Sequence, residues 1–383
     1  MAVAAPPREP SAPERAGAFG GRPGDAPIRP RSFSLTDWFV LGGAALSSLC
    51  LVWVLYYHLL PMSGFVGFLL WWFAAFTLIY WMAIRQIEGR LLAKDRLMAV
   101  LIAAGAVALV IPLVTILGFV LVKGIKYLTP HALSQTAQYC GTLDPPSCGG
   151  FSHAIVGTIE QVGIAVVLSV PLAILCAVFL NEIGGPLRRP IRLFVDAMSG
   201  VPSIVAGLFI YAVIVINFGF SGLAAALALS ILMLPTVTRT AEEVLRLVPD
   251  GLREGSLALG GSEWRTTWNV VLPTARSGLI TAVILGIARA VGETAPLILT
   301  SFGASVMNVN PLHGAQEALP LYVWNYIQFH QGSAPYQRAL TAALVLIILV
   351  LGLFVLARVL GARASFDKQQ KRAAKRERKA AAA

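Results

Sequence analysis

A pair of opposite charges lies in an otherwise apolar stretch of the sequence, GIARAVGETAPLILT. Arg289 and Glu293 are four residues apart, which would put both on one face of a helix. A charge inside a membrane costs about 2.5–3.5 kcal/mol on insertion scales, so it usually faces a bundle interior or water and serves a function. A guanidinium matches the oxygens of an oxyanion, and a carboxylate can accept a proton-bearing phosphate oxygen, which sulfate lacks at neutral pH. The pair is therefore interpreted as a contact on an oxyanion path, with a structural ion pair between helices as the alternative.

The segment 239–276 is a long charged stretch between two apolar spans, and its residue pattern predicts short helices. Asp250 can cap the start of one helix, because its carboxylate accepts free backbone N–H groups. Glycine tolerates a left-handed turn, so Gly260 and its neighbour are expected to end that helix. Ser262 is expected to cap the next helix, and Pro273 to close it. Such an element suits docking to a soluble partner; an ordinary amphipathic helix at the membrane surface is the alternative.

The composition is that of a membrane protein with several spans. The chain has 383 residues, of which 57% are hydrophobic and 13% charged, and these fractions exclude a disordered chain. Its formal net charge is +11. Basic residues gather in the loops expected on one side of the membrane: Arg85, Arg90, Lys94, Arg96, Arg188, Arg189, Arg192, Arg239, Arg246, Arg253, Arg265 and Arg276. The positive-inside rule explains this asymmetry without nucleic acid binding, and it puts both termini and the segment 239–276 in the cytosol.

Apolar runs predict an all-α polytopic membrane protein in the cell membrane, because each run is long enough to cross a bilayer. The expected spans are about 38–60, 65–84, 97–122, 153–180, 193–216, 222–237, 279–300 and 339–360. We divide the chain into a disordered cytosolic arm (1–34), an additional N-terminal transmembrane hairpin (35–96), a transmembrane domain (97–362) and a basic cytosolic tail (363–383). The tail is interpreted as solvated, and contact with anionic lipid is the alternative.

The four cysteines do not form a metal site. Cys140 and Cys148 flank the segment GTLDPPS on the expected outer side, where a disulfide and two free thiols are both open. The other two cysteines lie in apolar spans and are expected to be packing residues. Water is expected to solvate three polar residues near the outer end of the fourth span: Thr158, Glu160 and Gln161.

The segment 239–276 resembles the EAA loop of ABC importer permeases. That pattern is Glu-Ala-Ala, three residues, Gly, nine residues, an aliphatic residue, one residue, and Leu-Pro. The matching positions are Glu254, Gly260, Val270, Leu272 and Pro273, while Gly255 and Ser256 replace the two alanines. The resemblance implies that Glu254, Gly260, Leu272 and Pro273 belong to a coupling element that sits on a separate ATPase.

Two further motifs narrow the resemblance. The stretches ARAVGETAP, around Arg289, and DAMSGVPSIVAGLF at 196–209, together with the EAA loop, resemble phosphate-specific ABC importer permeases of the PstA type over about residues 97–360. This implies a type I ABC importer transmembrane domain, with a MetI-like six-helix core and an extra N-terminal pair of transmembrane helices, for which the family suggests no role. Arg289 and Glu293 would lie on the phosphate path. Arg239 would be the second path arginine, with a positive-inside anchor as the alternative.

The same resemblance implies a set of partners. They are a sister permease (PstC type), an ATPase dimer (PstB type), an extracytoplasmic phosphate-binding protein (PstS type), phosphate and membrane lipids. The sequence has no G-x-x-x-x-G-K-[ST] phosphate loop. We therefore expect a channel subunit that is not an enzyme and has no cofactor, with ATP and Mg on the partner ATPase. The alternatives are a permease for molybdate or sulfate, or a non-transporting membrane partner in phosphate signalling.

Overall fold

The computed structural model describes residues 35–60, 62–141 and 143–380, and over them the chain is helical apart from loops and an isolated bridge between Phe302 and Gln316. The helices are α1 Leu35–Val54, α2 Phe65–Ile87, α3 Arg90–Gly124, α4 Pro130–Ser134, α5 Ser152–Val178, α6 Arg188–Ser199, α7 Ser203–Ile210, α8 Ile216–Phe218, α9 Gly222–Arg246, α10 Asp250–Ala258, α11 Glu263–Thr266, α12 Leu272–Val291, α13 Ala295–Thr300, α14 Leu319–Ile327 and α15 Ala334–Ala380. Shorter turns are π-helical at Leu55–Leu59, Phe179–Ile183, Tyr211–Val215 and Thr267–Val271, and 3₁₀ at Ile125–Tyr127. The expected N-terminal arm and the last three residues of the expected tail lie outside the described residues.

Seven of the described helical segments are long and apolar enough to cross a membrane, and there are eight if one bent pair counts as a single span. That pair consists of Arg188–Ser199 and Ser203–Phe218, which are bent by 103°. The sequence predicted a single span here, at about 193–216. The prediction of one continuous helix is wrong, because the chain bends between α6 and α7. Gly200 ends α6, and Pro202 has no N–H and disfavours helical backbone at the residue before it.

The described chain forms two compact units, and the division between Pro112 and Leu113 falls inside α3. In the first unit α1 packs against α2, and its core is built by Ala44, Tyr80, Ile84 and Ala93. An ion pair of 3.3 Å between Asp37 and Arg96 joins the start of α1 to the first part of α3. Asp37 is buried, so the cost of removing its charge from water offsets part of the attraction to Arg96. The pair therefore also serves to fix the position of α1 relative to the first part of α3.

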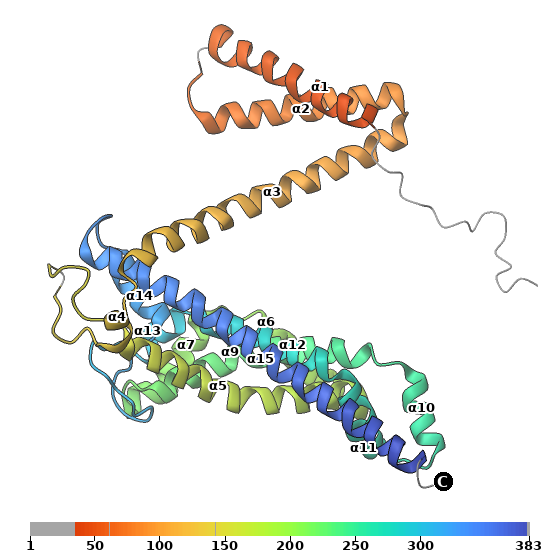
Figure 1. Ribbon diagram of the computed structural model, residues 1–383, viewed down its shortest axis with the longest axis vertical. Helices are drawn as coiled ribbons and strands as arrows, with labels where there is room; N and C mark the ends of the chain where they lie inside the picture. Colours follow the sequence, from red (N-terminus) through yellow and green to blue (C-terminus); the bar gives the residue numbers. More distant parts are fainter. Residues whose placement is uncertain (1–34, 61, 142, 381–383) are drawn as a thin grey trace, which may run out of the picture. The chain divides into compact units, whose positions relative to one another are not determined.

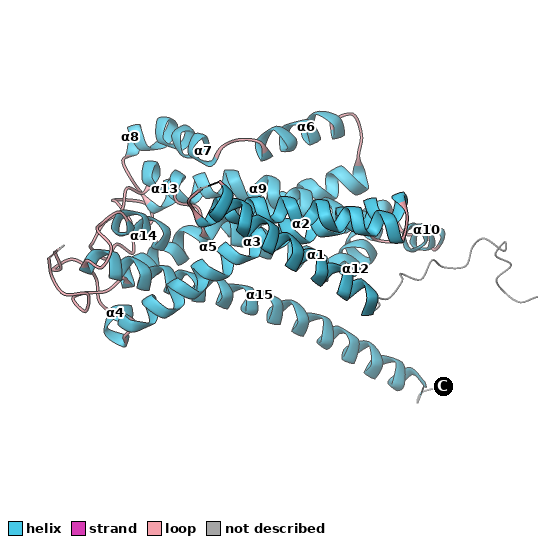
Figure 2. Cartoon of the chain, turned by 90° about the horizontal axis from the view of Figure 1, so that it is seen from above, coloured by secondary structure: helices cyan, strands magenta, loops and turns pink. Residues whose placement is uncertain are grey.

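The second unit is a helical bundle around α9. Helix α5 packs along α9, α12 packs against α9 and α15, and α14 packs on α15. In Figure 1 the short helices α4, α13 and α14 gather at one end of this bundle, and α10 and α11 lie at the other. Helices α6 and α7 lie on the opposite side of the bundle from α15 (Figure 2). One continuous core joins α5, α9, α12, α13 and α14, with Val162, Leu229, Val291, Leu297 and Leu321 among its buried side chains.

Close packing of α9 against α12 depends on a glycine. A Cβ atom added to Gly286 would overlap the Val237 side chain and press on Met233. Small residues let transmembrane helices approach closely, and the resulting dispersion contacts are a main source of their stability. Gly163 on α5 provides a comparison, because nothing lies within 4 Å of a Cβ added there.

We predict that Gly286→Leu lowers the stability of the bundle by about 1–3 kcal/mol, the usual cost of forcing extra volume into a packed core. Gly163→Leu should leave stability close to wild type. Thermal unfolding of both purified variants in detergent measures the difference. Equal melting temperatures would contradict the packing described for α9 and α12.

Candidate functional site

Arg289 and Glu293 lie where the seventh expected span breaks. Helix α12 ends at Val291, Gly292 caps it, and a new helix, α13, starts at Ala295. The expected continuous span at about 279–300 is therefore wrong, and Glu293 lies just beyond the helix that carries Arg289. Pro296 explains the break, because it has no N–H to bond the carbonyl one turn earlier and disfavours helical backbone before it.

The geometry of this pair leaves the guanidinium of Arg289 accessible. Its Nε lies 4.0 Å from Oε1 of Glu293, the limit for an ion pair, and the two side chains are 48% and 20% exposed. The position in the last turn of α12 favours a cation, because the end of a helix carries partial negative charge. An arginine held this loosely retains donors that can bind an anion in two-pronged fashion.

Arg239 lies in a different environment, a charge cluster between α6 and α9. Its guanidinium pairs with Asp196 of α6 and, through Nη1, with Oε2 of Glu242 at 3.3 Å. Glu242 is only 1% exposed, and it also pairs with Arg192 and with Arg246, the latter at 3.9 Å. These contacts satisfy the buried carboxylate and join the two helices. Arg239 and Arg289 lie on different helices, α9 and α12, and pair with different carboxylates.

The segment 239–276 folds largely into helix. Its first residues, including Arg239, are the last two turns of α9, and α10 follows after a short turn. Gly260 has φ +80° and follows the end of α10, and the Ser262 hydroxyl accepts the N–H of Arg265 at 3.4 Å at the start of α11. Both features agree with the sequence pattern.

Two details of this segment differ from the prediction. Pro249 occupies the capping position of α10, and the Asp250 carboxylate accepts from Arg253 Nη1 at 2.9 Å instead of capping backbone N–H groups. Pro273 does not close a helix, because it lies in the first turn of α12, where its missing N–H is tolerated. The π-turn Thr267–Val271 before it carries the chain into α12, and the Leu272 N–H bonds to the Thr267 carbonyl.

Helix α10 presents an exposed face with both charged and apolar residues. None of its residues is buried, Glu254 is exposed, and neither Gly255 nor Gly251 has an atom within 4 Å of an added Cβ. Large apolar side chains are exposed on α10 and the adjoining turns and helices: Leu247, Leu252, Leu257, Leu259, Trp264 and Trp268. Exposed apolar side chains grouped on one segment beside charged ones are typical of a protein or membrane contact surface.

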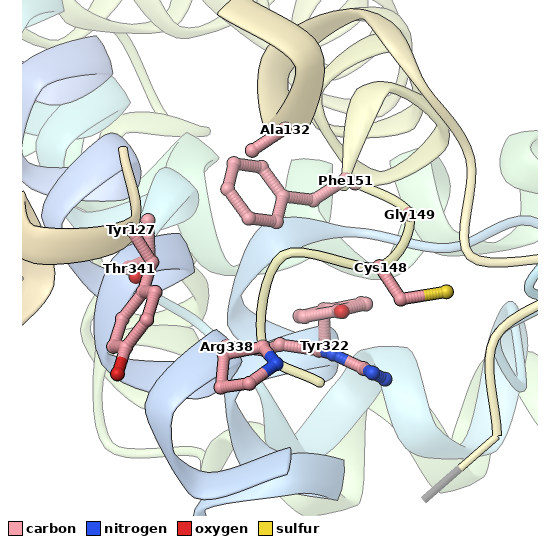
Figure 3. Close-up of a pocket in the computed structure, with 10 residues that line it drawn as sticks. Tyr127, Ala132, Cys148, Gly149, Phe151, Tyr322, Arg338 and Thr341 are labelled. Carbon is pink, nitrogen blue, oxygen red and sulfur yellow. The ribbon is translucent and has the colours of Figure 1, made fainter. Parts of the chain in front are cut away.

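The loop between α4 and α5 lies at the other end of the bundle. Cys140 and Cys148 are joined by a disulfide. Arg338 of α15 donates to three carbonyls of this loop, those of Gly141, Asp144 and Pro145, at 2.9–3.1 Å. Figure 3 shows Arg338 next to Cys148 in the pocket beneath the loop. The arginine is almost fully buried, so it fixes the loop to the last helix.

A buried polar network at this end was missed by the sequence analysis. Gln161 of α5 donates to Gln316 Oε1 at 3.0 Å, and Gln316 donates to Glu160 Oε2 at 2.6 Å. The hydroxyl of Thr158 accepts the N–H of Leu319 at 2.8 Å. Thr158 and Gln161 are buried, so the expectation that water solvates them is wrong. The sequence signal was the grouping of polar residues on α5, but their partners are more than 150 residues away.

Glu317 is a further buried acid that the sequence analysis did not single out. It lies in the loop before α14, where its Oε1 accepts the N–H of Ala318 at 3.3 Å. Burial raises the pKa of Glu317 to about 8, although backbone N–H groups of Ala318 and Ala304 partly oppose the shift. The carboxyl is therefore mostly protonated at neutral pH, which reduces the cost of burying it.

The described helices are those of a multi-pass membrane protein, with a charged pair at a helix break and an exposed helical segment between two spans. Residues 169–366 match the model of the family "Binding-protein-dependent transport system inner membrane component". The chain belongs to this family, whose members are permease subunits of ABC transporters, and its fold is the type I importer transmembrane domain with two additional N-terminal helices.

Curated relatives agree with the family assignment. The chain is 43% identical over 248 residues to "Phosphate transport system permease protein PstA 1" of Mycobacterium tuberculosis H37Rv, covering 64% of this chain and 80% of that protein. It is 39% identical to "Phosphate transport system permease protein PstA" of Mycobacterium leprae, covering 70% and 89%. It is 32% identical to "Probable phosphate transport system permease protein PstA" of Methanocaldococcus jannaschii, covering 68% and 92%. A structure of the MetNI methionine ABC transporter matches with a TM-score of 0.43 and 22% identity, over 57% of this chain and 94% of that one.

The raised pKa of Glu317 generates a prediction on pH and stability. The folded protein holds the proton up to about pH 8, whereas the unfolded chain loses it near 4.5, so this group's contribution to stability falls as pH rises between those values. A glutamine at position 317 carries no titrating proton, so Glu317→Gln should remove this loss of stability. The variant should therefore become more stable relative to wild type as pH rises towards 8.

Thermal unfolding of wild type and variant in detergent, at a series of pH values, measures this effect. The matched control is Glu263→Gln, which changes an exposed carboxylate and should follow the wild-type profile. Parallel profiles for wild type and Glu317→Gln would contradict the buried, protonated state.

Proposed function

We propose that this chain is a channel subunit of an ATP-driven importer of inorganic phosphate. The observation that carries the substrate assignment is Arg289, half-exposed at the end of an apolar helix and, within the described residues, paired at 4.0 Å with Glu293. Arginine is suited to phosphate because its planar fork meets two oxygens at once. The relatives named above are called phosphate transport permeases, which supports the same substrate.

Glu293 adds selectivity in this proposal. In the empty channel its carboxylate balances the charge of Arg289, which keeps the guanidinium oriented without occupying all its donors. When phosphate binds, the carboxylate accepts a hydrogen bond from a protonated phosphate oxygen. Sulfate has no such proton at neutral pH and would be repelled. This arrangement favours phosphate over fully ionised oxyanions.

Transport is driven by a partner ATPase. The sequence lacks a phosphate-loop motif, and the exposed face of α10, with Glu254, supplies a surface on which an ATPase can bind. Gly260 ends that surface helix, and Leu272 and Pro273 begin α12, which leads to Arg289. The remaining partners are a sister permease and an extracytoplasmic phosphate-binding protein. ATP and Mg bind to the ATPase, and its cycle switches the channel between outward-open and inward-open states.

The orientation follows the charge distribution. Both termini and the α10–α11 segment lie in the cytosol, because loops on that side carry most of the basic residues. The disulfide-bonded loop then lies on the oxidising side of the membrane. Arg239 is near the cytosolic end, where its pairs with Asp196 and Glu242 must open before it can contact phosphate. We assign it to the release step of the cycle.

The substrate assignment predicts that Arg289→Gln abolishes uptake of labelled phosphate while the complex still assembles. Arg289→Lys keeps the charge but loses the planar fork, so it should be impaired. The double variant Arg289→Gln with Glu293→Gln leaves no lone charge, and it should remain inactive because the anion contact is missing. Uptake in proteoliposomes, with molybdate and sulfate as competitors, measures all three.

A double variant that assembles and transports phosphate at the normal rate would show that the pair is only structural. Wild-type uptake that molybdate or sulfate suppresses as strongly as unlabelled phosphate does would refute phosphate selectivity.

The docking assignment predicts that Glu254→Arg leaves the protein in the membrane but abolishes stimulation of the partner ATPase. Glu254 is exposed, so reversing its charge changes the surface of α10 without disturbing the fold. Gly260 is a poorer test, since its φ of +80° would strain any other residue whatever the role of the surface. Co-purification with the ATPase and ATP hydrolysis in proteoliposomes measure the effect, and normal stimulation by Glu254→Arg would rule out docking at this face.

A further inference from the structure

The guanidinium of Arg253 connects α10 to the transmembrane bundle. Its Nε lies 3.1 Å from Oε2 of Glu182, and its Nη2 lies 2.9 Å from Oε1 of the same carboxylate. This is the two-pronged geometry in which an arginine–carboxylate pair is strongest and most directional. The side chains are only 19% and 8% exposed, so solvent screens the pair much less than a surface ion pair.

The same guanidinium also caps the end of α9. Its Nη2 donates to the carbonyl of Leu245, in the last turn of α9, at 2.9 Å, and its Nη1 donates to the carbonyl of Val248, in the turn after α9, at 2.6 Å. The last carbonyls of a helix have no partner inside it and carry partial negative charge, so a buried cation satisfies them. The hydrogen bonds to Glu182 raise the pKa of Arg253, which keeps it charged. One side chain therefore joins α10 to α9 and to Glu182.

Glu182 lies on a continuation of α5. It belongs to the π-turn Phe179–Ile183, which follows α5 without a break, and Asn181 donates to its Oε1 at 2.6 Å. Helix α5 packs along α9 through the centre of the bundle. A displacement applied to Glu182 therefore acts on the packing of α5 against α9.

Other contacts of α10 lead towards α11. The Ser256 hydroxyl lies 2.8 Å from that of Thr266, and the Gly261 N–H donates to the Ser256 carbonyl at 3.0 Å. Helix α10 buries none of its residues, and it also contacts the π-turn Thr267–Val271, which leads into α12. Among the described residues, the side chain of Arg253 links α10 directly to the ends of α5 and α9.

We propose that Arg253 and Glu182 are the positioning pair that carries the movement of α10 to the transmembrane helices α5 and α9. This rests on the proposed function, in which an ATPase moves α10. The two residues touch neither ATP nor the transported anion, and they act by holding three helix ends together. When α10 moves as a rigid body, the two-pronged pair moves the end of α5 with it.

The test uses the complete transporter with its ATPase and binding protein in proteoliposomes. Arg253→Met and Glu182→Gln should assemble and retain basal ATP hydrolysis. The ATP consumed per phosphate imported should rise by about tenfold or more, the factor that corresponds to losing one charge-assisted hydrogen bond. Arg253→Lys, which keeps the charge without the fork, should give an intermediate ratio.

Asp250→Asn is the matched control, because it changes an exposed partner of the same guanidinium and leaves the Glu182 pair intact. It should couple as wild type does. An assembled Arg253→Met or Glu182→Gln complex with a wild-type ratio of ATP to phosphate would overturn the proposal, and failure of both variants to assemble would overturn it in favour of a purely structural pair. Absence of phosphate uptake by the wild-type complex would instead refute the proposed function.

Discussion

The architecture depends on one constraint, the need of every backbone polar group inside a membrane for a hydrogen-bond partner. Helices meet this need internally, so a break is tolerated only where protein or water can satisfy the freed groups. The second unit contains two such breaks, after Gly200 and after Val291. Each break comes just before a proline, at Pro202 and Pro296. Pro112, Pro171 and Pro235 lie inside continuous helices, so the missing N–H favours these two breaks but does not by itself decide where a span is interrupted.

These two breaks also come together in space. Helix α7 packs on α13, and the Cα of Gly207 approaches Pro296 so closely that a Cβ there would overlap it. The segment after one break therefore contacts the segment after the other. Arg289 and Glu293 border this region on the α12 side. Irregular backbone and an accessible charge are found at the same place, which is where a polar path through a membrane protein can form.

Much of the fold could be predicted from the sequence because it depends on local chemistry. Apolar runs identified the spans, and the left-handed turn at Gly260 and the cap by Ser262 follow from single residue types. The breaks in the spans were missed, because an apolar run with a proline has the same composition whether it bends slightly or by 103°. The helix cap by Asp250 was wrong because the nearby Arg253 competes for the carboxylate, a contact that residue spacing does not reveal.

The candidate site was predictable only in part, for the same reason. Arg289 stands out because an arginine in an apolar run is costly. Arg253 looks like one more basic residue of a loop, and its role emerges only when Glu182, 71 residues earlier, is beside it. Glu317 and the glutamine pair were also hidden, because their burial depends on a loop that folds back onto α5 and the start of α9. The environment of a charge, which the sequence does not contain, decides what that charge does.

The anchoring of the disulfide-bonded loop by Arg338 has a consequence for biosynthesis. The carbonyls that accept from Arg338 precede it by 193 to 197 residues, so they leave the ribosome long before it does. Chains fold from the N-terminus as they emerge, and this loop must wait for the last helix to insert. The end of the bundle that carries α4 and α14 is therefore completed last. A chain that stopped before α15 would lack the arginine that holds this loop in place.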